Sequence, residues 1–168
     1  FRYDGETDAS EFKNSLNLGG KFILMYPGKI GTFYFIDRML EFYKTMLDII
    51  PNSIFYVLTC DDPAPMLRVA AGIGIKEDRI RIEKDVKFEE MPRYLRIASS
   101  GIFFINPYKK IGSSPIKLGE FLATGKPVII NPGIGDTEEI ISQNRVGVVV
   151  REFTQSSYQS AINGLLDL

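Results

Sequence analysis

Short apolar runs recur along the chain and alternate with segments whose apolar residues are spaced as on one face of a helix. Each run has the length of a buried strand, and most are followed by glycine, proline or charged residues. The pattern predicts strands at residues 22–26, 54–58, 80–82, 102–105, 128–130 and 146–150. It predicts helices at residues 35–50, 64–71, 89–98, 116–124, 136–142 and 155–166.

Strands that alternate with helices are typical of βαβ units, so the predicted fold class is α/β. We expect a Rossmann-like, doubly wound parallel sheet of about six strands flanked by helices. With 168 residues and 45% hydrophobic content, the chain can bury one core. Residues 1–20 are polar, end in two glycines and show no strong periodicity of apolar residues, which indicates a linker or interdomain segment. Residues 21–168 are interpreted as one domain.

The start of the fourth expected helix carries the most informative pattern. Ser114 fits the N-cap, Pro115 the first helical position and Gly125 the stop. Lys117 falls in the first turn, where a cation is unfavourable because the N-terminus of a helix is already partly positive. Backbone N–H groups, the hydroxyls of Ser113 and Ser114 and the ammonium of Lys117 therefore predict a phosphate site.

A second glycine-containing loop follows the first expected strand and holds Gly28, Lys29, Gly31 and Thr32. Glycines let the backbone approach a ligand closely, and Lys29 adds a cation. Taken alone, a tight turn with a solvated lysine is the more economical explanation. Because ligands of parallel sheets lie at the carboxyl ends of the strands, this loop and the helix start at Ser113 are expected to form two halves of one diphosphate site.

Glu120 lies one turn beyond Lys117, on the same helical stripe as Lys117 and Thr124, whereas Leu118, Phe121 and Leu122 are expected to face the sheet. Two interpretations of Glu120 are equally supported by the pattern. It forms an ordinary surface ion pair with Lys117, or its carboxylate accepts hydrogen bonds from sugar hydroxyls, as an acidic residue does in dinucleotide-binding folds.

Other loops carry weaker signals. Residues 84–88 and 106–110 follow the third and fourth strands and could frame a base or phosphates, although solvated loops are the favoured interpretation. Residues 133–138 match a dinucleotide fingerprint only in part. Asp61 and Asp62 could bind Mg²⁺, but a turn and helix cap is the favoured role.

Composition excludes several classes of function. The net charge of −1, from 20 basic and 21 acidic residues, disfavours a nucleic-acid partner. The chain has no histidine, which removes Ser–His and Cys–His nucleophile pairs and most zinc sites. We expect no metal site and no tightly bound cofactor. The single Cys60 excludes an internal disulfide and fits a cytoplasmic protein. No apolar run has the length of a membrane span, and the first residues lack the pattern of a signal peptide.

The stretch from Ser113 to Ile129, with Lys117, Glu120 and the Ala-x-Gly-x-Pro-Val-Ile exit from helix to strand, resembles the donor-site signature of group 1 (family 4-like) glycosyltransferases of the GT-B fold. The likeness extends from about Lys21 to residue 168 and covers only the C-terminal domain of such enzymes, which binds the nucleotide-sugar donor.

The resemblance implies roles for individual residues. Glu120 matches the second glutamate of the family's Glu-x7-Glu motif, which implies contact with the donor ribose, and Lys29 lies where many members carry an arginine for the diphosphate. The first glutamate, which typically contacts the transferred sugar, is replaced by Gly112. A second basic residue of the first loop would fall near Tyr34, so we hypothesise that Lys117 supplies that charge.

The function implied by the resemblance is transfer of a sugar from a UDP-sugar or GDP-sugar type of donor to an acceptor. Lys117 and Glu120 are the candidate catalytic residues, and stabilisation of the leaving diphosphate is the expected mechanism. The partners implied are the donor and an N-terminal acceptor-binding domain of the same protein, without which this chain is expected to be inactive.

The alternative is a nonenzymatic doubly wound module, nucleotide-sensing or receiver-like, although a receiver needs acidic residues where Gly28 and Lys29 stand. An epimerase of similar architecture is disfavoured because the chain has no histidine.

Overall fold

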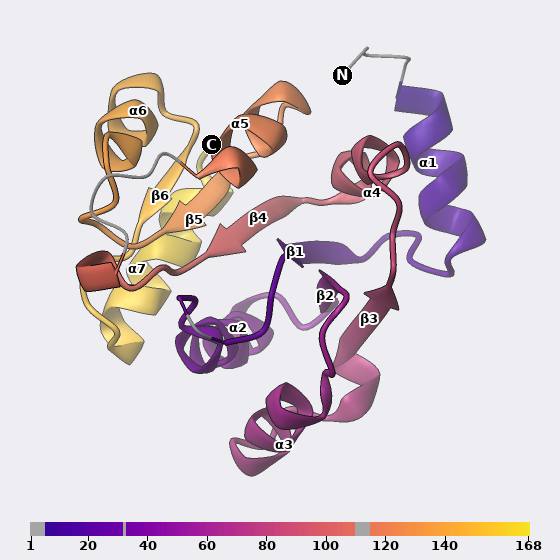
Figure 1. The fold of residues 1–168 in the computed structure, drawn as a ribbon, viewed down its shortest axis with the longest axis horizontal. Helices are drawn as coiled ribbons and strands as arrows, with labels where there is room; N and C mark the ends of the chain where they lie inside the picture. Colours follow the sequence, from indigo (N-terminus) through magenta and orange to yellow (C-terminus); the bar gives the residue numbers. More distant parts are fainter. Residues whose placement is uncertain (1–5, 32, 110–114) are drawn as a thin grey trace.

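The computed structural model describes residues 6–31, 33–109 and 115–168 and contains one six-stranded sheet in the order β3-β2-β1-β4-β5-β6 (Figure 1). All of its pairings are parallel, as the alternation of strands and helices predicted. The strands are β1 (Phe22–Pro27), β2 (Ser53–Thr59), β3 (Ile80–Lys84), β4 (Ser100–Phe103), β5 (Val128–Ile130) and β6 (Gly147–Val149).

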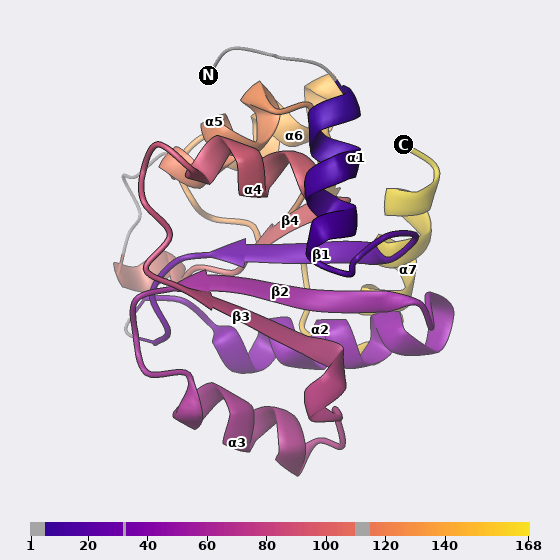
Figure 2. The same cartoon turned by 90° about the vertical axis from the view of Figure 1, so that its right-hand side faces the viewer.

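Helices cover both faces of the sheet, which confirms the doubly wound fold. Figure 2 shows α1, α4, α5 and α6 on one side of the sheet and α2 and α3 on the other, while α7 packs against α2. The helices are α1 (Glu6–Ser15), α2 (Ile36–Ile49), α3 (Ala64–Gly72), α4 (Met91–Ile97), α5 (Ile116–Ala123), α6 (Thr137–Asn144) and α7 (Gln155–Leu166). Short 3-10 helices occupy Glu77–Arg79 and Pro107–Lys109.

The central strands are apolar because helices cover them on both faces. Every residue of β2 is buried, and so is all of β1 except Phe22. The fourth strand begins two residues earlier than predicted, because Ser100 and Gly101 are small enough to lie buried between β1 and β5. The predicted strand residues Phe104 and Ile105 are buried beyond the end of β4.

The first twenty residues contain a helix that the sequence pattern did not predict. Within α1, Phe12 is only 8% exposed, and its ring meets that of Tyr94 on α4 edge to face, with centroids 5.0 Å apart. The Arg93 guanidinium lies 4.0 Å from the centroid of the Phe12 ring. Leu18 is also buried. This segment therefore contributes to the core, while its assignment as a linker between domains stays a prediction.

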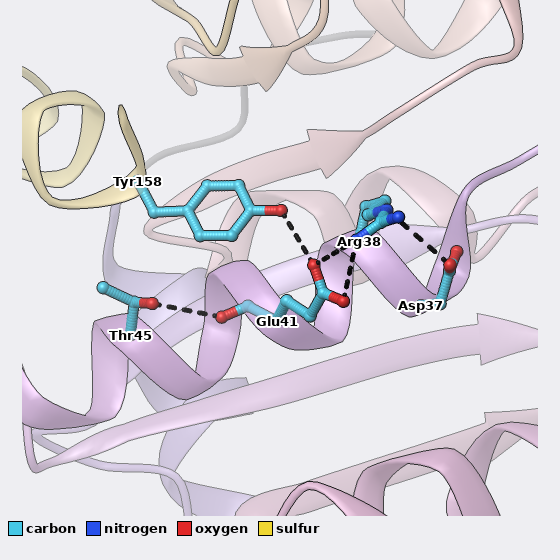
Figure 3. A network of polar contacts seen from close by, with 5 residues as sticks. All are labelled: Asp37, Arg38, Glu41, Thr45 and Tyr158. Atoms are coloured by element: carbon cyan, nitrogen blue, oxygen red, sulfur yellow. Dashed lines mark hydrogen bonds and ion pairs between the residues drawn. The ribbon is translucent and has the colours of Figure 1, made fainter. Parts of the chain in front are cut away.

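A polar network joins α2 to α7 (Figure 3). The Glu41 carboxylate accepts two hydrogen bonds of 2.9 Å from the Arg38 guanidinium and one of 3.2 Å from the Tyr158 hydroxyl. Burial and the nearby Glu41 raise the pKa of Tyr158, so the phenol stays protonated as a donor. Asp37 adds an ion pair to Arg38, and the Thr45 hydroxyl donates to the Glu41 carbonyl. The network holds α7 on the helix that follows the first glycine loop.

The strand order places the topological switch point between β1 and β4. The chain leaves β1 toward α2 on one face and leaves β4 toward α5 on the other, so the loops after these two strands diverge from neighbouring positions. In open parallel sheets, ligands bind at this position, outside the carboxyl ends of the strands. The fold thus directs attention to the loop after β1 and the start of α5.

Candidate functional site

A pocket of about 320 Å³ lies at the carboxyl edge of the sheet, where β1 and β2 end and α5 begins. The structure brings Gly28 and Lys29 of the first loop together with Lys117 and Glu120 of α5, as the two-halves hypothesis expects. The pocket is lined by Pro27, Gly28, Lys29, Leu58, Thr59, Cys60, Asp61, Val86, Met91, Ile116, Lys117 and Glu120. Of the other predicted site residues, Thr32, Ser113 and Ser114 lie outside the described residues.

The loop after β1 is anchored at three points. The Gly28 N–H donates to the Leu58 carbonyl at 2.8 Å, and the Ile30 N–H donates to the Asp61 carboxylate at 2.7 Å. The Tyr26 hydroxyl donates to the Lys29 carbonyl at 2.6 Å. Since these bonds fix the backbone on both sides of Lys29, the loop presents a defined edge to the pocket.

Gly31 forms the turn of this loop and does not line the pocket. It has a φ of +100°, which favours glycine, and its carbonyl accepts the N–H groups of Phe33 and Tyr34. Glycine at this position is explained by the turn, and the ligand-binding role expected for Gly31 stays a prediction.

Asp61 and Asp62 have the turn and cap roles that the sequence favoured. Besides accepting the Ile30 N–H, Asp61 has its own N–H bound to the Thr59 hydroxyl. The Asp62 carboxylate accepts the N–H of Ala64, the first residue of α3, at 3.1 Å. Both carboxylates thus organise the backbone around the pocket.

The start of α5 differs by one residue from the prediction. Pro115 is the N-cap, with φ −67° and ψ 125°, and the first helical residue is Ile116. The extended backbone of Pro115 explains this, because a residue inside the helix would need a helical ψ. The end matches the prediction: the N–H of Gly125 donates to the Leu122 carbonyl and that of Lys126 to the Phe121 carbonyl, which forms a Schellman motif at a glycine with φ +67°.

Packing of α5 against the sheet fixes which of its side chains reach the pocket. Leu118 and Phe121 are buried, as predicted, and Leu122 is partly buried against the core. The Phe121 ring lies directly over Gly101 of β4. Lys117 and Glu120 face the pocket. Thr124, expected on the same stripe, instead lies buried at the far end of the helix, where its hydroxyl donates to the Phe121 carbonyl at 2.9 Å.

Lys117 spans the gap between the two halves of the site. Its ammonium donates to the Tyr34 hydroxyl at 2.7 Å and lies 4.3 Å from the centroid of the Tyr34 ring. It also lies beside Gly28, because a Cβ built on that glycine would be 2.8 Å from Lys117 Cε and 3.1 Å from Nζ. Among the described contacts no ion pair joins Lys117 to Glu120, so the surface-pair interpretation is wrong.

The remaining predicted loops contribute unequally. Of residues 84–88, Val86 lines the pocket, and Met91 of α4 extends this apolar wall. None of the described residues in 106–109 or 133–138 lines it. In the latter loop the Thr137 hydroxyl donates to the Ile134 carbonyl and Glu138 forms an ion pair with Arg151, both of which stabilise the turn into α6.

A second cavity of about 420 Å³ lies at the opposite edge of the sheet, where α1, α4 and α5 end. Lys13, Arg96 and Lys126 line it. Burial, and then the charge of Lys126, lowers the pKa of Lys13, whose ammonium donates to the Lys21 carbonyl at 2.7 Å. Cations at helix C-termini complement the negative end of the helix dipole, which explains this cluster structurally.

Sequence comparison finds no counterpart, since no family model and no curated protein matches the chain. Solved structures match its fold. WaaG, a glycosyltransferase involved in lipopolysaccharide biosynthesis, has a TM-score of 0.80 at 15% identity over 98% of this chain and 43% of its own. HepE from Anabaena, solved in complex with UDP-glucose, has a TM-score of 0.77 at 12% identity, and the match covers 98% of this chain and 44% of HepE. The UDP-forming trehalose-phosphate synthase of Burkholderia xenovorans has a TM-score of 0.69 at 12% identity, and the match covers 96% of this chain and 42% of the synthase.

The chain therefore has the fold of one domain of these glycosyltransferases, which are of the GT-B type. At these identities the likeness establishes architecture alone, and the chain spans less than half the length of each of the three. No helix within the described part of the chain is long and apolar enough to cross a bilayer.

Proposed function

We propose that this GT-B domain binds the nucleoside diphosphate sugar used by a glycosyltransferase, and that the protein transfers the sugar to an acceptor. The observation that carries the proposal is the position of Lys117, whose ammonium crosses from α5 to the glycine loop after β1 at the edge of a pocket beyond the carboxyl ends of the strands. The complex of HepE with UDP-glucose supports the choice of ligand class.

The chemistry that this site would perform is stabilisation of a leaving group. When the bond between the anomeric carbon and the phosphate oxygen breaks, its electron pair stays on the diphosphate, which gains negative charge. Lys117 and the exposed Lys29 provide cations for this charge, and the hydrogen bonds that anchor the loop hold the backbone from which Lys29 extends. Preorganised charges of this kind lower a barrier without rearranging as the charge develops.

The rest of the pocket suits a nucleoside. Glu120 is half-buried at its wall, where a carboxylate can accept hydrogen bonds from ribose hydroxyls. Leu58, Val86 and Met91 form an apolar side against which a base can lie. We therefore assign ribose recognition to Glu120 and the diphosphate to Lys29 and Lys117.

The proposal is tested by calorimetric titration of the chain with UDP, GDP and ADP, and of a Lys117→Met variant with whichever binds best. Loss of a charge-assisted hydrogen bond to phosphate should cost about 1.5–3 kcal/mol, a tenfold or greater loss of affinity. Lys76→Met is the matched control, because Lys76 is exposed and lies outside the pocket. Failure of all three nucleotides to bind would favour the receiver-like module instead.

A second expected result concerns activity. The acceptor site and any catalytic base are proposed to belong to an N-terminal domain, as in the family that the sequence resembles. The 168-residue chain should therefore bind a nucleoside diphosphate weakly and transfer no sugar. An assay with radiolabelled UDP-glucose and GDP-mannose and a panel of sugar acceptors would check this, and transfer above the no-enzyme rate would contradict the division of roles.

A further inference from the structure

Lys117 does not project freely into solvent from α5. Its side chain is half-buried, its ammonium donates to the Tyr34 hydroxyl at 2.7 Å, and the same ammonium lies 4.3 Å from the centroid of the Tyr34 ring. An ammonium has three N–H donors, so two remain for other acceptors after this bond. The contact therefore fixes the direction of the charge without exhausting its capacity to bind an anion.

Tyr34 is itself held rigidly. It forms an isolated antiparallel bridge with Ile105, and its neighbours are tied to the same segment: the Phe35 N–H donates to the Phe104 carbonyl at 2.9 Å, and the Asn106 N–H donates to the Phe33 carbonyl at 2.8 Å. These bonds attach the end of the first loop to the chain that leaves β4. Tyr34 is thus a fixed point on which a flexible lysine can be ordered.

The Tyr34 ring is also coupled to the other half of the site. It meets the fully buried ring of Tyr26 at a centroid distance of 5.7 Å, in an edge-to-face arrangement. The Tyr26 hydroxyl donates to the Lys29 carbonyl at 2.6 Å. Burial, and then the proximity of Tyr34 and Asp61, raises the pKa of Tyr26, so it remains a donor. The two tyrosines therefore fix the Lys117 ammonium and the Lys29 backbone relative to each other.

We infer that Tyr34 is a positioning residue, which holds the Lys117 ammonium against the glycine loop so that Lys117 and Lys29 can bind the same diphosphate. The inference rests on the proposed function and deepens it. The first loop has Tyr34 where a second basic residue is expected from the family resemblance, and Tyr34 would instead hold the Lys117 ammonium from α5 beside this loop. Tyr34 acts through Lys117, and its hydroxyl is the group that matters.

The test is a Tyr34→Phe variant of the full 168-residue chain, which keeps the ring and removes the hydrogen bond. Affinity is measured calorimetrically for the best-bound of UDP, GDP and ADP and for the corresponding nucleoside. We expect the affinity for the nucleoside diphosphate to fall about fivefold to tenfold and that for the nucleoside to stay unchanged. Tyr158→Phe is the matched control, because it removes a tyrosine hydroxyl bonded to Glu41, outside the pocket.

The possible outcomes separate the two claims. If the unmodified chain binds the nucleoside diphosphate and Tyr34→Phe binds it equally well, the positioning role is wrong and the proposed function stands. Equal losses for nucleoside and diphosphate would assign Tyr34 to the general structure of the pocket and would also overturn the role. If no nucleotide binds, both proposals fall.

The contact can also be checked without any ligand. The ε-methylene protons of Lys117 should carry a ring-current shift in the NMR spectrum, because the ammonium next to them lies 4.3 Å from the centroid of the Tyr34 ring. A Tyr34→Leu variant should lose that shift, while Tyr34→Phe should retain part of it. An unchanged shift in the leucine variant would show that Lys117 does not contact the Tyr34 ring in solution, and the inference would then be wrong.

Discussion

Replacing Asn131 with leucine is expected to destabilise the protein by about 3 kcal/mol or more, since two buried backbone groups would lose their partners. Asn131 directly follows β5 and is only 4% exposed. Its side-chain carbonyl accepts the Ile105 N–H at 2.7 Å, and its amide donates to the Ile105 carbonyl at 2.9 Å and to the Pro132 carbonyl at 3.2 Å. Leucine has a similar size but cannot form any of these bonds.

Denaturant unfolding measures the loss, and amide hydrogen exchange at Ile105 shows whether it is local. The control is Asn144→Leu, because Asn144 is exposed and its amide bonds only within α6, to the Ile140 carbonyl. That variant should lie within about 0.5 kcal/mol of the unmodified protein. Equal stability of the two variants would show that the Asn131 bonds contribute nothing net.

The second large effect is expected at Gly101, where alanine should lower the free energy of unfolding by about 2–3 kcal/mol. A Cβ at this position in β4 would lie 2.4 Å, 2.5 Å and 2.6 Å from three atoms of the Phe121 ring. Phe121 is fully buried, so its ring can yield only if α5 moves away from the sheet. Because α5 carries Lys117 and Glu120, nucleotide affinity should fall together with stability.

Gly119 offers a matched control on α5 itself. It is exposed, and a Cβ there would meet no atom within 4 Å. Gly119→Ala should therefore be neutral or stabilise the helix by about 0.5–1 kcal/mol. A Gly101→Ala, Phe121→Leu double variant should regain part of the lost stability, since leucine gives space to the new methyl group. If Gly101→Ala unfolds at the same denaturant concentration as the unmodified chain, α5 is not seated as described.

The fold could be predicted largely from periodicity, because strands covered on both faces are apolar throughout and amphipathic helices such as α2 show their buried face in the spacing of Met39 and Tyr43. Helix α1 was missed for a physical reason. Its burial depends mainly on Phe12, whose partners Tyr94 and Arg93 lie far away in the sequence, so the local pattern holds little of the information.

The candidate site was partly predictable. Glycines and lysines after β1 and at the start of α5 are visible in the sequence, and the parallel topology brings them to one edge. The contact of Lys117 with Tyr34 depends on a distance across the sheet edge, which spacing alone does not encode. In the sequence, Asn131 is only a polar residue that follows an apolar run. Its structural role could not be predicted, because it depends on hydrogen bonds to Ile105 on a neighbouring segment.

The attachment of α7 to α2 bears on how the polypeptide matures during translation. The bond between Tyr158 and Glu41 joins residues 117 positions apart, and the Phe42 and Tyr158 rings meet at a centroid distance of 5.5 Å. While a ribosome is still producing the chain, this side of α2 stays uncovered until residues 155–166 have emerged. The apolar side of α2 is therefore completed only by a segment that is synthesised more than a hundred residues later, so this surface stays exposed on the nascent chain during that interval.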